Sequence, residues 1–242
     1  MREEIYMIPV NDGVDKGTEC PFCAMYDKLE SDIIKQIMGS AYMDEDVRLK
    51  SDKLGFCKTH IRRLYNMRNS LGVALMMHTH LKKVLKDIEN MGAPNKKSLF
   101  GKKEKDIFEE YREKKNSSCY ICDKIELSLK RYEETFIALW KKDDKFREKV
   151  MSSKGFCVEH YLRIMTVARK KLSEKDFERF FEEMTKLFRE NMARVDGDID
   201  WFEKKFDYRY SAESWKNSKD ALPRTILKAM GYNVEEDNLN GD

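Results

Sequence analysis

Eight side chains with metal-ligand chemistry fall into two sets that have the same order along the chain. Each set has a CxxC motif followed by GFCxxH, and nearly the same number of residues separates the two motifs in both halves. Three thiolates and one imidazole are a standard closed ligand set for tetrahedral zinc. The sets are Cys20, Cys23, Cys57 and His60, then Cys119, Cys122, Cys157 and His160. The sequence therefore predicts two zinc ions per chain, one in each half.

The ligands are expected at the starts of helices. CxxC brings two thiolates close enough to share an ion, and CxxH at i, i+3 spacing puts both ligands on one side of a first helical turn. Cys57 and Cys157 each follow Gly-Phe and precede a segment of helical periodicity. A Cys3His zinc site has a net charge of about −1, which a helix N-terminus stabilises by roughly 0.3 to 1 kcal/mol.

Three other uses of these cysteines stay open. CPFC after the strand-like segment Ile5–Val10 resembles the dithiol site of glutaredoxins and thioredoxins, in which the helix dipole lowers a thiol pKa. The intervening segment Asn11–Cys20 and the lack of a strand-like segment before the second CxxC argue against this interpretation. An iron–sulfur cluster with one histidine ligand is the second alternative. The third is metal-free packing, which leaves the repeated spacing unexplained.

Apolar residues at helical spacing predict an all-α fold, and no window alternates strictly enough to indicate a sheet. One helix is expected to stop at Gly39, and a long helix or a pair of helices is expected from Ile61 to Ile88. A long apolar stripe joins Phe177 to Phe206. A last amphipathic helix is predicted over Asp220–Met230, with Asp220 as its N-cap and Pro223 in its first turn.

The chain is interpreted as two duplicated helical units, each with its own Cys3His site, followed by a C-terminal helix. The similarity between the halves extends past the ligands, for example to Arg63 and Arg163. A flexible start is expected for the linker, then a short solvated helix over Asp106–Lys115, and Glu235–Asp242 is expected to be disordered. The predicted divisions are a first repeat at 1–93, a charged linker at 94–117, a second repeat at 118–210, and a C-terminal helix and tail at 211–242.

The two remaining histidines, His78 and His80, point to nearly opposite sides of a helix and so cannot share a metal ion. His78 falls on the stripe of Leu71, Leu75 and Leu85. It is therefore predicted to be a hydrogen-bonded core histidine, and neither residue has a counterpart in the second half.

Composition limits the partners and the location. The 242 residues include 47 basic and 44 acidic side chains, and this near balance argues against nucleic-acid binding. The N-terminal residues lack a secretory pattern, and no apolar stretch reaches the ~20 residues of a membrane helix. These features predict a cytoplasmic protein without membrane insertion. In that compartment six cysteines favour metal ligation or redox chemistry over disulfides.

A family resemblance rests on CPFC, GFCKTH, NSLGVALMMHTHL, GFCVEH, DWFEKKFDYRY and KNSKDALPRTILKAMG. Together these motifs resemble an uncharacterised bacterial family defined as a domain of unknown function. Some members carry labels that connect them with ABC-transporter ATPases. This chain has no Walker A motif, so it could not itself be such an ATPase. The resemblance implies metal binding by the eight cysteine and histidine positions and implies no reaction.

The function expected from the sequence is that of a zinc-stabilised helical interaction or adaptor protein with a protein partner. The familiar hydrolase, phosphate-binding and dinucleotide-binding motifs are absent, which leaves enzymatic activity undecided and favours a non-enzymatic role. A thiol-based redox sensor or oxidoreductase that uses the CxxC pairs is the alternative. A nucleic-acid-binding zinc protein is the third hypothesis. The sequence does not specify the partner or the oligomeric state.

Overall fold

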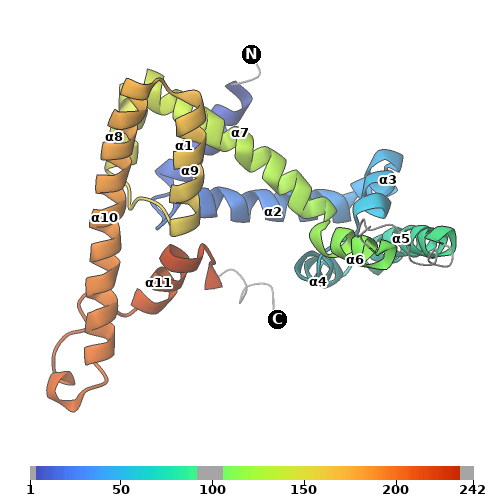
Figure 1. The fold of residues 1–242 in the computed structure, drawn as a ribbon. Helices are drawn as coiled ribbons and strands as arrows, with labels where there is room; N and C mark the ends of the chain where they lie inside the picture. The colour runs from blue at the N-terminus through green and yellow to red at the C-terminus, as the bar shows by residue number, and fades with distance from the viewer. Residues whose placement is uncertain (1–3, 92–105, 235–242) are drawn as a thin grey trace, which may run out of the picture. The chain divides into compact units, whose positions relative to one another are not determined.

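Helices and short connections make up the fold, which confirms the all-α prediction. The computed structural model describes residues 4–91 and 106–234, and these contain no strand (Figure 1). The helices are α1 Glu4–Asp15, α2 Pro21–Gly39, η1 Ala41–Met43, α3 Glu45–Leu54, α4 Lys58–Asn66, α5 Ser70–Met91, α6 Ile107–Ser117, α7 Tyr120–Lys142, α8 Asp144–Met151, α9 Val158–Lys171, α10 Glu174–Lys204, η2 Tyr208–Tyr210 and α11 Ala221–Met230.

The chain forms two compact units. The terminal unit combines Met1–Lys28 with Leu127–Asp242, and the central unit is Leu29–Glu126. The unit boundaries fall inside α2 and α7. Each unit therefore contains residues from both sequence repeats. The predicted ranges 1–93 and 118–210 describe the repeats in the sequence and do not coincide with the compact units.

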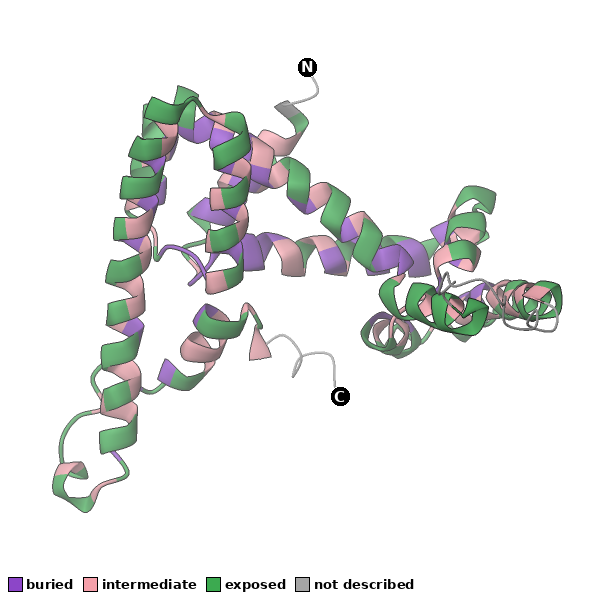
Figure 2. Ribbon diagram, in the orientation of Figure 1, coloured by how far each residue is buried: buried purple, intermediate pink, exposed green. Residues whose placement is uncertain are grey.

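Aromatic side chains dominate the core of the terminal unit. Phe22, Phe136 and Phe156 contact one another there and are fully buried. Helix α10 packs against α8, α9 and α11. Its buried residues recur along one side, whereas the rest of the helix is exposed or half-buried (Figure 2). The stripe predicted from Phe177 to Phe206 is thus only partly core, because α10 ends at Lys204 and Phe206 is 75% exposed.

The central unit is built around α5, which packs against α3, α4 and η1. The buried residues of α5 are Gly72 and Met76, whereas Leu71 is 65% and Leu85 is 55% exposed. A side chain at Gly72 would lie 3.1 Å from the Tyr42 ring, so the small residue permits close packing. The stripe that the sequence suggested as the apolar face of α5 therefore lies mainly on its exposed side.

His78 lies on this exposed side, so the prediction of a core histidine is wrong. Polar contacts instead anchor the neighbouring face of α5. The Thr79 hydroxyl donates to the Asp52 carboxylate at 2.6 Å, and His80 Nδ1 lies 2.8 Å from the Asp52 carbonyl oxygen. The spacing of apolar residues along α5 could not predict these contacts, because they are made by polar side chains.

Helix ends were predicted more accurately than helix faces. Helix α2 ends at Gly39, and α11 begins after Asp220 with Pro223 in its first turn, although the Asp220 side chain makes no capping hydrogen bond. Asp106 caps α6 by accepting a hydrogen bond from the Phe108 N–H at 2.9 Å. The strand-like segment Ile5–Val10 lies inside α1, so that interpretation is wrong.

Two predictions, a flexible start to the linker and disorder over Glu235–Asp242, fall outside the described residues. Within the described part of the chain, every helix is too short or too polar to cross a membrane.

Candidate metal centres

The eight cysteine and histidine side chains form two clusters, and each cluster draws on both halves of the sequence. We call Cys20, Cys23, Cys157 and His160 the Cys20 cluster, and Cys57, His60, Cys119 and Cys122 the Cys57 cluster. The Cys20 cluster lies within the terminal unit and the Cys57 cluster within the central unit. The prediction that each half completes its own ligand set is wrong. Both halves carry the same motifs, so spacing alone could not decide which CxxC meets which GFCxxH.

All four motifs lie at helix N-termini, as the sequence suggested. Helices α2 and α7 begin directly after Cys20 and Cys119, while Cys57 and Cys157 are the N-caps of α4 and α9. Their placement directs helix dipoles toward the thiolates, which favours negative charge there.

A glycine two residues before each N-cap cysteine allows the backbone to turn just before the helix begins. Gly55 has φ of +67° and Gly155 has φ of +72°, a left-handed conformation that glycine adopts without a steric penalty. At Gly55 an added Cβ would also lie only 2.9 Å from the His80 ring. The glycine of GFCxxH thus serves the backbone rather than the ligands.

The four donor atoms of each cluster lie close together. In the Cys20 cluster, His160 Nδ1 lies 3.6, 3.4 and 3.1 Å from the sulfurs of Cys20, Cys23 and Cys157. In the Cys57 cluster, His60 Nδ1 lies 3.2, 3.3 and 3.3 Å from those of Cys57, Cys119 and Cys122.

Sulfur–sulfur distances agree with the geometry of a tetrahedral site. They are 3.7 Å between Cys23 and Cys157 and 4.0 Å between Cys57 and Cys122. Zinc bonds of about 2.3 Å to sulfur and about 2.05 Å to nitrogen imply separations of about 3.8 Å between sulfurs and about 3.6 Å from sulfur to nitrogen. A disulfide needs about 2.05 Å, and all six cysteines are free. The sulfur–sulfur distances therefore fit a tetrahedral metal ion, whereas the sulfur–nitrogen distances are up to about 0.5 Å shorter than in such a site.

The Cys57 cluster lacks the positive charge that three thiolates require. Burial opposes protonation of His60, but hydrogen bonds with Cys119 and Glu30 raise its pKa to about 10. Burial likewise opposes ionisation of Cys119, yet the hydrogen bond with His60 lowers its pKa to about 6. Burial and the charge of Cys119 raise the pKa of Cys122. One imidazolium thus offsets one thiolate, and a divalent cation would allow all three thiols to ionise.

A buried carboxylate fixes the orientation of His60. Glu30 accepts from His60 Nε2 at 2.8 Å and from Arg63 Nη1 at 2.5 Å, and its side chain is 3% exposed. With Nε2–H donated to Glu30, Nδ1 is left to face the thiols. In the terminal unit Arg163 similarly donates to the buried Glu133. The motif spacing did not reveal either glutamate, although an arginine three residues after each histidine was a shared signal.

The two clusters differ in burial. Every member of the Cys20 cluster is buried, whereas Cys57 is half-buried and Cys122 is exposed. Helix α11 covers the Cys20 cluster through Lys228, which is 1% exposed. Lys228 Nζ donates to the carbonyl oxygens of Glu19 at 2.7 Å and Lys154 at 2.5 Å. Burial lowers the pKa of Lys228, opposed in part by the charge of Glu19.

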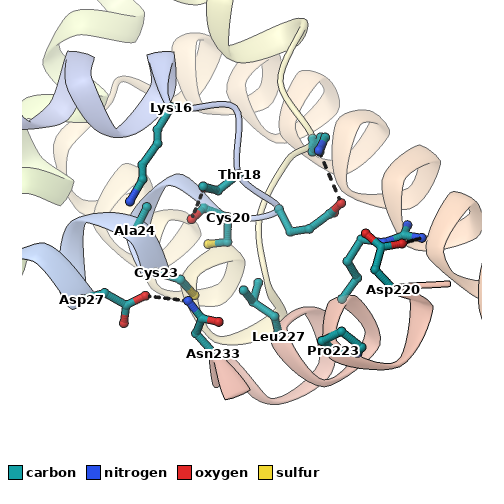
Figure 3. A pocket seen from close by; sticks show the side chains of 13 residues that line it. Lys16, Thr18, Cys20, Cys23, Ala24, Asp27, Asp220, Pro223, Leu227 and Asn233 are labelled. Carbon is teal, nitrogen blue, oxygen red and sulfur yellow. Dashed lines mark hydrogen bonds and ion pairs between the residues drawn. The ribbon is translucent and has the colours of Figure 1, made fainter. Parts of the chain in front are cut away.

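A cavity of about 240 Å³ lies between α11 and the segment leading into α2 (Figure 3). Cys20 and Cys23 line one part of it, and Leu227 faces them from α11. The Asn233 side chain donates to Asp27 at 3.2 Å, which ties the residues after α11 to α2. Although they line the cavity, the side chains of Cys20 and Cys23 are buried, at 0% and 4% exposed.

Comparison with known proteins identifies the family but no activity. The chain belongs to the family of unknown function DUF6062, whose model matches residues 1–236. This confirms the resemblance to a family defined as a domain of unknown function. No curated protein and no solved structure matches the chain.

Proposed function

We propose that this member of DUF6062 is a zinc-stabilised helical interaction protein that holds one zinc ion at each cluster. The observation that carries the proposal is the repeated set of three sulfurs and one Nδ1, whose atoms converge in both clusters with sulfur–sulfur distances close to those around tetrahedral zinc. Six free cysteines are consistent with a cytoplasmic location, where thiols stay reduced.

A structural role for zinc follows from the closed ligand sets. Four protein donors leave no coordination position for a substrate or an activated water, which catalytic zinc sites require. Each ion would also join segments far apart in sequence, since Cys23 and His160 are separated by 137 positions. Zinc binding would therefore contribute directly to the free energy of folding.

The exposed side of α5 supports a protein partner. Leu81, Leu85 and Ile88 are 55%, 55% and 50% exposed, and their spacing puts them on one face of the helix. Contiguous exposed apolar residues on a folded protein commonly mark an interaction surface. The near balance of basic and acidic residues gives a nucleic-acid partner no comparable support.

Elemental analysis and native mass spectrometry of the purified protein test the metal sites. We expect two zinc ions per chain, and X-ray absorption should give three sulfurs and one nitrogen around each ion. His60→Ala and His160→Ala should each reduce the zinc content by one ion. A folded, monodisperse and metal-free protein would contradict the proposal.

The interaction role needs a separate test. We expect crosslinking in the producing cell to capture a protein with the wild-type chain and to lose it with Leu81→Glu/Leu85→Glu. An exposed control, Leu162→Glu on α9, should retain the captured protein. Equal capture by all three chains would show that the exposed face of α5 does not bind the partner.

A further inference from the structure

The second cysteine of CxxC has opposite exposure in the two clusters. Cys23 and Cys122 occupy the same motif position in the two halves and the same place in the first turn of α2 and α7. Cys23 is 4% exposed, whereas Cys122 is exposed. Cys23 and Cys122 can therefore be compared directly, because the two thiols have the same local sequence position and differ mainly in the residues that cover them.

Helix α11 and the residues after it account for the protection of Cys23. Lys228 binds the backbone on both sides of the cluster, through the carbonyl oxygens of Glu19 and Lys154. The Gly231 carbonyl oxygen lies 3.8 Å from Cys23 Sγ, and a Cβ at Gly231 would lie 3.5 Å from Cys157 Sγ. Backbone therefore lies directly against the thiols of the Cys20 cluster.

In the Cys57 cluster the accessible thiol has a second thiol beside it. Cys122 Sγ lies 4.0 Å from Cys57 Sγ, and Cys57 is itself half-buried. The other two members, His60 and Cys119, are buried at 2% and 3% exposed. An attacking reagent can thus reach Cys122 first and finds Cys57 next to it.

We propose that the Cys57 cluster is an oxidant-responsive switch in which Cys122 is modified first, and that the Cys20 cluster is a permanent structural centre. The inference rests on the zinc sites proposed above. Reactive cysteines combine thiolate character with access to solvent, and here access separates the two clusters.

The oxidant is a peroxide, and the chemistry needs no other reagent. The Cys122 thiolate attacks one peroxide oxygen, so an S–O bond forms, the O–O bond breaks, and the leaving hydroxide takes a proton to become water. The Cys57 thiolate then attacks the sulfenic sulfur, so an S–S bond forms and a second hydroxide leaves and is protonated. Two thiolates, one hydrogen peroxide and two protons thus give one disulfide and two waters.

The disulfide removes two of the four ligands of the cluster. His60 and Cys119 alone do not complete a tetrahedral site, so the ion is released. The Cys20 cluster belongs to the other compact unit and keeps all its ligands. Oxidation is therefore expected to alter the central unit while the terminal unit keeps its metal.

The first experiment uses the wild-type protein loaded with two zinc ions. Hydrogen peroxide is added in substoichiometric steps, released zinc is followed with a colorimetric chelator, and cysteine peptides are mapped by mass spectrometry. We expect one zinc released per peroxide consumed, a plateau at one zinc per chain, and a Cys57–Cys122 disulfide. Iodoacetamide should label Cys122 at least tenfold faster than Cys23.

Variants test the cause of the difference. Lys228→Met leaves the carbonyl oxygens around the Cys20 cluster without their donor and should loosen α11, so labelling of Cys23 should accelerate at least tenfold while that of Cys122 is unchanged. Lys219→Met, at an exposed position before α11, is the matched control.

The outcomes separate the two proposals. A protein purified without zinc would contradict the proposed function as well as the switch. A protein with two zinc ions that releases both together, or releases the Cys20 cluster ion first, would overturn the switch and leave the zinc sites intact. Equal labelling of Cys23 and Cys122 in the loaded wild-type protein would overturn it in the same way.

Discussion

Glu30 shows how a single buried carboxylate prepares a ligand for metal. It holds Nε2 of His60, and Arg63 holds the other oxygen of the carboxylate. The imidazole therefore presents Nδ1 to the three sulfurs in a fixed orientation, and the negative charge behind it makes the ring a better donor.

We expect Glu30→Gln to lower zinc affinity at the Cys57 cluster by about 10- to 100-fold, because the neutral amide weakens the polarisation of His60. Competition with a chromophoric chelator measures this loss, and the affinity of the Cys20 cluster should not change. Glu109→Gln, exposed on α6, is the control. Equal affinities for Glu30→Gln and wild type would show that Glu30 only fills space.

Zinc binding at the Cys57 cluster should release protons and weaken as the pH falls. Without metal, the pKa values of His60 and Cys122 are raised, so both groups carry protons near neutral pH. Binding must displace at least these two protons, and a lower pH therefore favours the metal-free state. Calorimetry in two buffers of different ionisation enthalpy measures the number of protons released on zinc binding. Binding enthalpies that do not depend on the buffer would contradict this expectation.

At the scale of the elements, α5 shows that the spacing of apolar residues predicts a helix without determining which of its sides is buried. Its leucines repeat at helical spacing, yet its buried positions are Gly72 and Met76. Close approach of Tyr42 to Gly72 and the hydrogen bond from Thr79 to Asp52 select the buried side. Helix ends were predictable because caps, glycines and prolines act locally, as at Gly39 and Pro223. Helix faces depend on neighbours that the local pattern does not contain.

A pair of truncations checks the assignment of the α5 face. Met76→Ala should reduce the free energy of unfolding by about 2 to 5 kcal/mol, because it opens a cavity in the central unit. Leu85→Ala, at a position 55% exposed, should change it by less than about 0.5 kcal/mol. Urea denaturation of the zinc-loaded proteins measures both free energies. A larger loss for Leu85→Ala than for Met76→Ala would mean that the leucine side of α5 is the buried one.

At the scale of the whole molecule, each of the two cysteine–histidine clusters combines side chains from both sequence repeats. The identities of the eight candidate ligands came from spacing alone, whereas their grouping did not. Every CxxC is chemically compatible with every GFCxxH, and only the packing of α2, α4, α7 and α9 separates the alternatives. Each compact unit likewise contains residues of both sequence repeats.

Separate production of the two halves tests the crossed grouping. Residues 1–93 and 106–242, made as two polypeptides, should each lack a complete native site and bind zinc weakly. Mixed in the presence of zinc, they should assemble one to one with two zinc ions per pair, as measured by native mass spectrometry. One tightly bound zinc in each isolated half, with no assembly on mixing, would support ligand sets within each half instead.

The crossed grouping also imposes an order on biosynthesis. Cys20, Cys23, Cys57 and His60 leave the ribosome long before Cys119, so a complete but non-native ligand set exists first. The Cys57 cluster obtains its last ligand at residue 122, while the Cys20 cluster waits until residue 160. Metal captured too early would hold the nascent chain in the wrong connection, a kinetic trap for a chain of this length. On the proposed zinc sites, the timing of metal delivery during synthesis would decide whether the nascent chain reaches its native ligand sets.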